Sequence, residues 1–534
     1  MKKLLLETSF SKIYMIVMII ISILLVGGYF SYAMFTVSKE KNNAISIVTG
    51  NLTYKLEVDG TEGNTLTVPA NSSKEFIVTL TNPNNRVARF NFYYMGDLSN
   101  EIEAGYIEED GYNITPLATG TNLEKEGTNG SSNIYKIMVT NMGKSEINIK
   151  LGVSVGLDYN DLELPDNTHV FDKYSISFLN KILVDNELQE EKQHMFNYTN
   201  YGMKYGESKV NQDYITNGLY STEDEDGTSY YYRGEIDNNN VQFGEYDSDY
   251  YVYSYSIGYF QSLEACQEYN PNCSENNKVK LASKGDKMYW KIVRVNGDGS
   301  LRLIYNGTSI NPSNTSFENT YLIGKTVYNM DATHQKYTGY TYDKDNIEKD
   351  SFIKRELETW YKNTLGNNSN YDLKIADGRF CNDTSGYKSG SDYGLTGREG
   401  DYFFSSMYRV VQRLYNFKVD INPTLICPDT SESFGGSYRL KVGLITADEL
   451  VFAGESHSVK GYSYISPGDT GHGYWTITPV TLNSDGADCY EERTQYLFSS
   501  NINGLTGLRP VININAENRF TSVDGTASSP YVIK

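Results

Sequence analysis

Short runs of alternating apolar and polar residues dominate the chain after residue 44. The apolar positions recur at every second residue in residues 52–58, 76–80, 90–94 and 147–155. Successive side chains of a strand point to opposite faces, so a period of two is typical of strands with one buried and one solvated face. Residues 44–182 are therefore predicted to form an all-β sandwich domain of antiparallel strands.

Residues 183–215 lack such a pattern, and we interpret them as a linker. Strand patterns return from Gly218 onward. Residues 288–295 and 301–305 alternate on either side of an Asn-Gly-Asp-Gly turn. This arrangement predicts a β-hairpin, because glycine tolerates the positive φ angles of such turns.

Two segments of the second part predict helices. Behind Ser351, apolar residues recur at positions 353, 357, 360, 361 and 365 with the spacing of one helix face. Thr446 and Glu449 form a capping box, and Gly454 is placed to end the helix that follows. Residues 216–534 are thus predicted to be a mixed α+β domain.

An uncharged apolar stretch at residues 13–35 is long enough to cross about 30 Å of hydrocarbon as a helix. Lysines precede it within residues 1–12, so the positive-inside rule predicts a cytoplasmic tail there and places the body of the chain outside the cell. A cleaved secretory signal is the alternative, because small residues stand at positions 31 and 33. The apolar run exceeds the usual signal core of about 7–15 residues, which favours a retained single-pass transmembrane helix.

Composition narrows the classes of partner. The chain has 67 acidic and 47 basic residues, giving a net charge of −20, and its basic residues form no stripe along the sequence. Nucleic acid is therefore not expected as a partner, since nucleic-acid binding needs clustered lysine and arginine. With 47 tyrosines and 46 glycines but only 12 prolines, the composition indicates strands and turns rather than a disordered chain.

All five cysteines lie in the second half of the chain. Export to an oxidising exterior favours disulfides. We predict that Cys266 pairs with Cys273 and that Cys381 pairs with Cys427, which leaves Cys489 over. No metal site is predicted, because the sequence has no Cys-x-x-Cys pair and its five histidines are scattered.

The first domain resembles the exported sandwich domains of camelysin and related biofilm-fibre proteins. The resemblance covers about residues 44–180 and rests on Gly-Asn-Leu-Thr-Tyr at residues 50–54 and on Glu-Phe-Ile-Val-Thr-Leu-Thr-Asn-Pro at residues 75–83. It implies a surface or matrix module.

The second domain resembles bacterial C-type-lectin-like domains related to the formylglycine-generating enzyme fold, as found in exported Gram-positive proteins. The resemblance rests mainly on Tyr-Trp-Thr-Ile-Thr-Pro at residues 474–479 and Gly-Leu-Arg-Pro-Val-Ile at residues 507–512. It implies that the segment between Trp475 and Gly507 is displayed toward a ligand. The candidate ligand-binding residues in that segment are Asn483, Asp485, Tyr490, Glu492, Arg493, Tyr496, Asn501 and Asn503.

The sequence contains no recognisable catalytic constellation. It has no Gly-x-Ser-x-Gly elbow, no His-Glu-x-x-His helix, no phosphate-binding loop and no dinucleotide fingerprint. Formylglycine-generating enzymes use a pair of reactive cysteines near the chain end, where this chain has only Cys489. No catalytic residue is therefore assigned.

Three further segments have two interpretations each. The acidic runs at residues 223–227 and 247–249 offer oxygen ligands for calcium, but their spacing is that of no known loop, so solvated acidic turns are the better interpretation. Tyrosines at alternate positions in residues 250–259 are able to stack against sugars. The same spacing is typical of side chains that cover one face of a strand, and we favour this second interpretation.

The leading hypothesis is a non-catalytic, membrane-anchored extracellular protein that binds a glycan or a protein ligand through its C-terminal domain. Two rival functions remain open. One is an envelope hydrolase whose carboxylates lie far apart in sequence, and the other is a structural matrix or fibre subunit built on the sandwich.

Overall fold

The computed structural model describes residues 53–533 with gaps, of which the two longest are residues 197–216 and 386–407. The predicted cytoplasmic tail at residues 1–12 and the predicted transmembrane segment at residues 13–35 lie outside the described residues. Within the described part, no helix has the length and apolar character needed to traverse a bilayer. The anchor therefore stays a prediction from sequence.

The chain folds as two compact units, Met1–Ser175 and Ile176–Lys534. The second unit thus begins before the predicted sandwich boundary at residue 182. Helix α3 (Phe178–Asp185) explains the difference, because Phe178 and Ile182 are buried in the core of the second unit. These two apolar side chains lie one helical turn apart and so share one face of the helix.

Part of the predicted linker at residues 183–215 also belongs to the second unit. Met195 is buried there, and the Arg233 guanidinium donates a hydrogen bond of 3.0 Å to its carbonyl oxygen. Tyr231 donates to the carboxylate of Glu191 at 2.9 Å. The linker prediction is therefore wrong for these residues, which contact Tyr231 and Arg233 of the strand at Gly227–Arg233.

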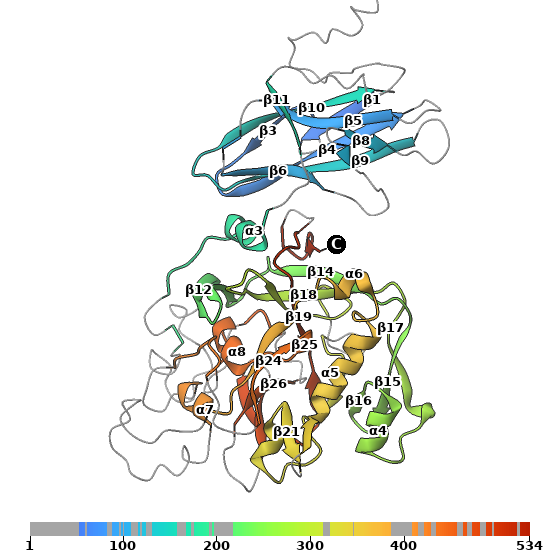
Figure 1. Cartoon of the computed structure of the whole chain (residues 1–534), viewed down its shortest axis with the longest axis vertical. Helices are drawn as coiled ribbons and strands as arrows, with labels where there is room; N and C mark the ends of the chain where they lie inside the picture. The colour runs from blue at the N-terminus through green and yellow to red at the C-terminus, as the bar shows by residue number, and fades with distance from the viewer. Residues whose placement is uncertain are drawn as a thin grey trace, which may run out of the picture. The chain divides into compact units, whose positions relative to one another are not determined.

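The N-terminal unit is an all-β sandwich of two sheets (Figure 1). One sheet has the strand order β2-β1-β4-β9-β6, and the other has the order β3-β10-β5-β8-β7 with β11 beside β5. The strands are β1 (Thr53–Val58), β2 (Thr61–Glu62), β3 (Thr65–Val68), β4 (Ser72–Asn82), β5 (Ala88–Met95), β6 (Ile102–Ile107), β7 (Pro116–Leu117), β8 (Gly120–Leu123), β9 (Ser131–Asn141), β10 (Ile147–Gly156) and β11 (Thr168–Val170).

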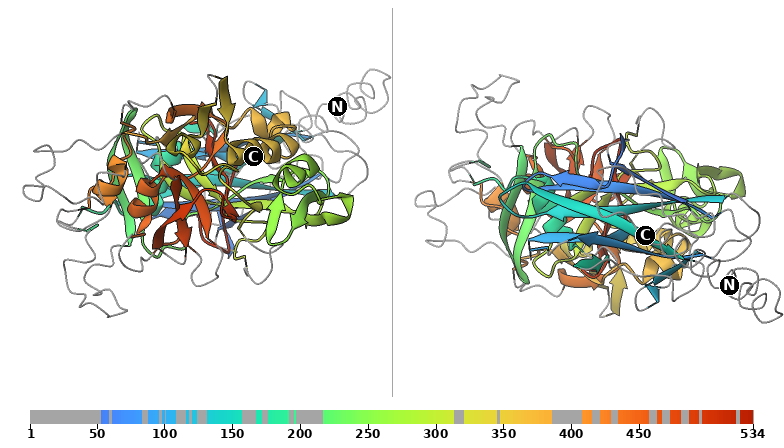
Figure 2. Two further views of the ribbon diagram at one scale, coloured as in Figure 1. Left: turned by 90° about the horizontal axis from the view of Figure 1, so that it is seen from below. Right: turned by 90° about the horizontal axis from the view of Figure 1, so that it is seen from above.

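Neighbouring strands of the sandwich run antiparallel, as the sequence predicts; β4 and β9, for example, pair over their full lengths. Figure 2 shows the long strands of this unit running side by side. Phe76 and Val78 of β4 share one buried cluster with Leu151 and Val153 of β10 in the opposite sheet. The alternating apolar residues therefore face each other between the two sheets, and their burial supplies the main stabilising free energy.

The second unit contains two eight-stranded sheets. The first has the order β12-β13-β18-β19-β30-β25, with β14 beside both β18 and β31. Its strands are β12 (Gly218–Asp224), β13 (Gly227–Arg233), β14 (Asn240–Glu245), β18 (Lys287–Val295), β19 (Leu301–Tyr305), β25 (Val442–Gly443), β30 (Val511–Ile514) and β31 (Tyr531–Val532). The predicted hairpin is present as β18 and β19, and Gly299 in its turn has a φ of 81°.

The other sheet has the order β17-β15-β16-β20-β29-β26-β27-β28. Its strands are β15 (Tyr250–Tyr255), β16 (Gly258–Phe260), β17 (Lys278–Ala282), β20 (Gly324–Thr326), β26 (Tyr474–Pro479), β27 (Asp488–Arg493), β28 (Tyr496–Asn501) and β29 (Thr506–Leu508). The described residues also form two two-stranded sheets: β21 (Thr341–Lys344) with β22 (Ile347–Asp350), and β23 (Gly378–Asn382) with β24 (Gly436–Leu440).

Few helices accompany these sheets, so the second unit is β-rich. They are α4 (Leu263–Tyr269), α5 (Phe352–Asn363), α6 (Ser369–Asp372), α7 (Arg409–Leu414) and α8 (Ala447–Ala453), with 3-10 turns at Glu275–Asn277 and Gln335–Thr338. The two predicted helices are α5 and α8. Ser351 caps α5 through a side-chain bond from Lys354 N–H, and α8 has the predicted Thr446–Glu449 capping box and ends at Gly454.

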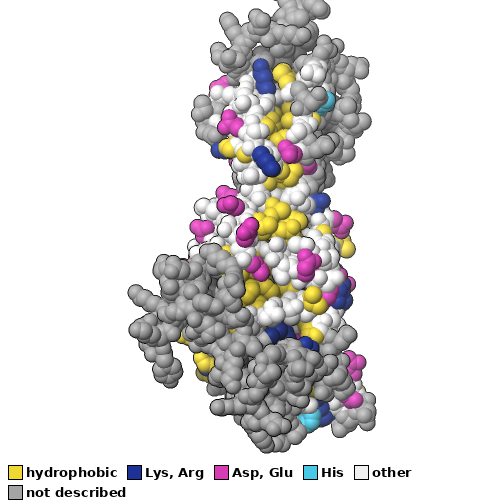
Figure 3. Space-filling view, turned by 90° about the vertical axis from the view of Figure 1, so that its left-hand side faces the viewer, with side chains coloured by type: hydrophobic (Ala, Val, Ile, Leu, Met, Phe, Trp, Pro, Cys, Tyr) yellow, Lys and Arg dark blue, Asp and Glu magenta, His cyan; other side chains and the backbone are white. Residues whose placement is uncertain are grey.

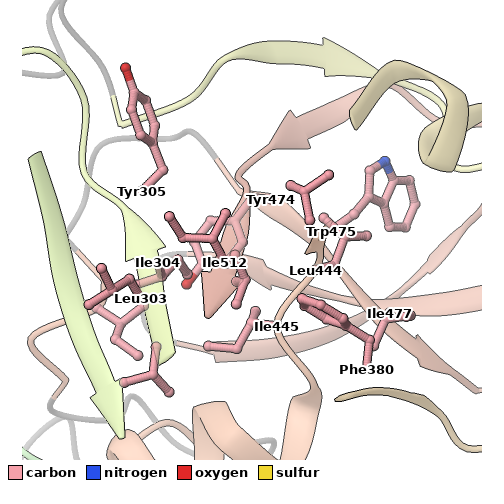
Figure 4. Packing of buried hydrophobic residues seen from close by; sticks show 14 of the residues in the cluster. Leu303, Ile304, Tyr305, Phe380, Leu444, Ile445, Tyr474, Trp475, Ile477 and Ile512 are labelled. Carbon is pink, nitrogen blue, oxygen red and sulfur yellow. The ribbon is translucent and has the colours of Figure 1, made fainter. Parts of the chain in front are cut away.

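The core of the second unit lies between its two large sheets. Figure 4 shows Ile304 of β19 and Ile512 of β30 beside Tyr474 of β26, with Ile445 next to them. Trp290, Trp360 and Trp475 are each fully buried and are among the largest buried side chains of the described residues. All three tryptophans of the chain lie in this unit, so tryptophan fluorescence monitors the folding of this unit alone.

Both predicted disulfides are present. Cys266 and Cys273 are bonded with their Cα atoms 5.8 Å apart, and Cys381 and Cys427 with theirs 5.6 Å apart. Cys489 is a free, buried thiol whose pKa is raised well above its ordinary value by burial. A thiol that stays protonated is a poor nucleophile, so Cys489 is a core residue rather than a reactive one.

Candidate functional site

The segment between Trp475 and Gly507 was predicted to be a freely variable ligand-facing surface. Most of its described residues instead form strands β27 and β28, which extend the sheet from β26. Trp475 lies in β26 and Gly507 in β29, and both strands belong to the same sheet. The segment is therefore part of the fold, and its residues divide into buried and exposed sets.

Tyr490 and Glu492 are buried, so the prediction that they face a ligand is wrong. Tyr490 is 0% exposed within the core cluster, and Glu492 is 1% exposed and accepts a hydrogen bond of 2.6 Å from the Ser466 hydroxyl. The reason is that residues 489–492 are all buried, so both faces of β27 are covered by other parts of the second unit. Polar residues on such a strand are covered by neighbouring elements that the local sequence does not reveal.

Four of the predicted residues lie at the surface. Arg493 ends β27, Tyr496 opens β28, and Asn501 and Asn503 are exposed at the far end of that strand. Asn483 and Asp485 lie outside the described residues. These four residues are therefore accessible to solvent, and their binding of a ligand stays a prediction.

Phe498 joins these residues and was missed by sequence reasoning. Its side chain is 41% exposed in β28, where a large apolar group gains nothing from the core. Tyr496 and Phe498 are two residues apart on one strand face and their ring centroids are 5.9 Å apart. The period of two that predicted the sandwich strands is the signal that identifies this pair.

Arg493 completes a small surface that we call the β28 patch, made of Arg493, Tyr496 and Phe498. The guanidinium lies 5.5 Å from the centre of the Phe498 ring, within the range of a cation–π contact. It also forms an ion pair with the buried carboxylate of Glu491, whose other oxygen accepts a hydrogen bond of 2.6 Å from Thr506. Thr506 holds the Glu491 carboxylate, and this carboxylate holds the guanidinium over the Phe498 ring. Half of the Arg493 side chain nevertheless stays exposed.

The β28 patch is suited to binding rather than to covalent chemistry. It offers ring faces and a guanidinium, but none of its side chains is a nucleophile with an activating base. Aromatic rings and arginine are the residue types that most often dominate recognition surfaces.

A buried network of charges lies elsewhere, beside the Cys381–Cys427 disulfide and around a cavity of about 30 Å³. Glu449 is paired with Arg302 at 2.5 Å and with Arg294 at 3.1 Å. Burial alone would raise the pKa of Glu449, but the two guanidiniums hold it below its ordinary value. Glu449 therefore stays ionised and does not serve as a proton donor.

The same network contains the carboxylates that a hydrolase interpretation would need. Arg413 contacts Asp383 at 2.6 Å and Asp448 at 2.7 Å, and Arg294 contacts Asp224 at 2.8 Å. Residues far apart in sequence thus do come together here. Each of these carboxylates is bound by an arginine, however, and the arrangement is that of a buried ion-pair scaffold.

The acidic runs considered for calcium are engaged in the fold. Asp224 pairs with Arg294, and Glu225 accepts a hydrogen bond of 2.6 Å from the backbone N–H of Cys427. Asp249 accepts from the backbone N–H of Lys284 at 3.0 Å. Among the residues that the structure describes, no cluster of three or more acidic, histidine or cysteine side chains is arranged to hold a metal ion.

The tyrosines of residues 250–259 mostly line a strand. Tyr250 is buried and donates to Gln261 at 2.9 Å, whereas Tyr253 and Tyr255 pack against the cluster around the Cys266–Cys273 disulfide. Tyr251 is the one of these four that is exposed by more than a third, at 39%. The strand-paving interpretation therefore accounts for this run.

On the face shown in Figure 3, described lysine and arginine side chains are scattered among acidic ones.

Comparison of the chain with protein-family models, with curated proteins and with solved structures finds no match. The resemblances to camelysin-like sandwiches and to C-type-lectin-like domains therefore stay proposals from sequence. Any assignment of function rests on the residues and geometry described above.

Proposed function

We propose that the chain is a non-catalytic protein of the cell exterior, anchored by residues 13–35, whose second unit binds a glycan through the β28 patch. The observation that carries the proposal is the ring pair of the partly exposed Tyr496 and the exposed Phe498, with the Arg493 guanidinium over the Phe498 ring. Ring faces bind the apolar faces of sugars, while the guanidinium of Arg493 supplies hydrogen-bond donors.

The size of the patch favours a glycan over a protein. Two rings and one guanidinium match one or two sugar residues, whereas a stable protein interface buries about 800 Å² on each partner. The residues lie in the segment that the resemblance to C-type-lectin-like domains assigns to ligand recognition. Binding of a protein is therefore the less favoured version of the proposal, and the experiment distinguishes the two.

Other features support export and argue against catalysis. Two disulfides suit an oxidising compartment, because the cytosol keeps most thiols reduced. The carboxylates gathered beside the second disulfide are neutralised by arginines, which leaves the envelope-hydrolase alternative without a free acid–base pair in that network. The camelysin-like sandwich is compatible with either a surface receptor or a fibre subunit.

The test is a glycan array probed with the full-length chain in detergent. We expect the wild type to bind a defined set of glycans, and the variant Arg493→Ala/Phe498→Ala to bind them at least about tenfold more weakly, equivalent to about 1.4 kcal/mol. Tyr251→Ala is the matched control, since it removes an equally exposed ring from another strand.

The outcomes separate the alternatives. Wild-type binding that the double variant retains would place the site elsewhere. Binding to envelope proteins but to no glycan would select the protein-ligand version, and filaments in the absence of any ligand would favour the structural-subunit alternative.

A further inference from the structure

A cavity of about 380 Å³ lies between helices α4 and α5, which are neighbours in the second unit (Figure 1). It is separate from the β28 patch, with which it shares no lining residue. Glu264, Ala265 and Glu268 line it from α4, and Phe352, Glu356 and Thr359 line it from α5. The cavity thus has an apolar wall and several carboxyl groups.

Glu356 is the unusual member of this lining. Its residue is 2% exposed, and one carboxyl oxygen, Oε2, accepts a hydrogen bond of 2.9 Å from the backbone N–H of Gln261. Gln261 is itself held by Tyr250 and by the carbonyl of Ile323. One oxygen of the Glu356 carboxyl group is therefore held in place by the backbone of Gln261.

The other oxygen, Oε1, has no hydrogen-bond partner among the described residues of the protein. Oε1 is not one of the buried side-chain atoms that lack a partner in the described part of the chain, so this oxygen is open to the cavity. A carboxyl oxygen that lines a cavity and lacks a protein partner is placed to bind a donor from outside.

The charged side chains that line the cavity indicate whether the bound donor is a cation or an anion. Four carboxyl groups and two cationic groups form the wall. Arg355 is already bound to Glu268 through two hydrogen bonds of 2.8 and 2.9 Å and lies over the Phe352 ring. A cation is therefore accommodated better than an anion.

We propose that this cavity binds an alkylammonium group. The ammonium donates a hydrogen bond to Oε1 of Glu356, and the carbon chain packs against Phe352 and Ala265. An ammonium carries three donors and no acceptor, which suits a site built from carboxyl oxygens. The group is either part of a free amine or the side chain of a lysine in another protein.

Binding is coupled to a proton. Burial raises the pKa of Glu356 to about 8, while the Gln261 N–H and Arg355 act to lower it and Glu268 acts to raise it. Glu356 is therefore mostly a neutral carboxylic acid at pH 7. When an ammonium binds, the carboxyl group ionises and releases one proton to solvent, so that affinity rises as the pH approaches 8.

Other charged groups also face this carboxyl group. Glu264 lines the cavity from α4, and Glu358 and Lys362 line it from α5. Tyr250 packs nearby from β15, and burial raises its pKa well above the ordinary value, so it stays neutral over this pH range.

The experiment is isothermal titration calorimetry of the full chain with 1,5-diaminopentane and with Nα-acetyl-lysine amide. Titrations at pH 6.5 and 8.0 in two buffers of different ionisation enthalpy measure proton release directly. We expect at least tenfold tighter binding at pH 8.0 than at pH 6.5, with close to one proton released at pH 6.5. Binding of one probe and not the other identifies whether a free amine or a lysine side chain is preferred.

Glu356→Gln tests the assigned residue, because glutamine mimics the neutral carboxyl group and should preserve the fold. We expect this variant to bind at least tenfold more weakly at pH 8.0 and to lose the proton release, with unchanged tryptophan fluorescence. Glu348→Gln is the control, since it makes the same substitution at an exposed position outside the cavity.

Any one of three results would overturn the proposal. The first is that neither amine binds the wild type, and the second is that Glu356→Gln binds with unchanged affinity and pH dependence. The third is that the uncharged analogue 1-pentanol binds as tightly as the amines.

Discussion

At the residue scale, burial divides the tyrosines of the β27–β28 hairpin into two kinds. Tyr490 is fully buried in the main core, whereas Tyr496 is partly exposed on the outer strand. Replacing a buried aromatic ring by alanine removes its transfer free energy and leaves a cavity. The same replacement at a partly solvated position loses far less.

We therefore expect Tyr490→Ala to lower the free energy of unfolding by about 3–5 kcal/mol, and Tyr496→Ala by less than about 1 kcal/mol. Urea unfolding followed by tryptophan fluorescence measures both values, because all three tryptophans lie in the second unit. Equal effects of the two substitutions would contradict the burial described for Tyr490.

Glu356 gives a second prediction at this scale. Its pKa is about 8 in the folded chain and close to the ordinary value of 4.5 when unfolded, so the folded state holds a proton that the unfolded state loses between these values. Stability contributed by this group is fully present below about pH 4.5, falls as pH rises by up to about 1.4 kcal/mol per unit, and levels off above about pH 8.

Glu356→Gln removes this titration. Relative to the wild type, the variant should gain stability progressively from pH 5 to pH 8, as measured by urea unfolding at several pH values. A difference between the two proteins that does not change with pH would show that Glu356 is ionised in the folded state.

At the element scale, the two disulfides should contribute unequally. The Cys266–Cys273 bond spans a sequence separation of 7 residues, and the Cys381–Cys427 bond spans 46. Closing a longer loop removes more conformational entropy from the unfolded chain. The second bond is thus expected to stabilise the fold more.

The Cys381→Ser/Cys427→Ser variant should lose about 4 kcal/mol, and Cys266→Ser/Cys273→Ser about 2.5 kcal/mol. Urea unfolding under non-reducing conditions provides the measurement, with the wild type in reducing agent as a reference. A larger loss for the shorter loop would mean that packing of Cys266 and Cys273 in their buried cluster outweighs the loop entropy.

Elements with local signals were predictable from sequence, and those that depend on distant neighbours were not. The capping box at Thr446 and the turn ending at Gly299 act over three or four residues, and both are present. The burial of Tyr490 depends on the parts of the second unit that cover the faces of β27, which alternation along the strand does not encode.

Helix α5 held a signal that was overlooked. Glu356 falls on the same face as Ile353 and Trp360, at the i+3 and i+4 spacings of an apolar stripe. A carboxyl group within such a stripe must be buried, and it is therefore a candidate for a shifted pKa. By contrast, the cavity beside Glu356 is formed by α5 together with α4, which lies almost a hundred residues earlier in the chain. No local sequence pattern predicts that these two helices meet.

At the scale of the whole molecule, the proposed topology places both folded units on the same side of the membrane. Residues 13–35 are the stretch long enough and apolar enough to cross it, and the lysines that precede them favour a cytoplasmic N-terminus. The two disulfides in the second unit agree with this orientation, because they persist in an oxidising exterior.

Protease treatment of intact cells tests this topology. Peptides from both units should be released without detergent, whereas peptides from residues 1–12 should appear only after the cells are opened. The control is a cytoplasmic marker protein that stays intact under the same conditions. Release of peptides from the two units only from opened cells would place them inside, and the disulfides would then require another source of oxidation.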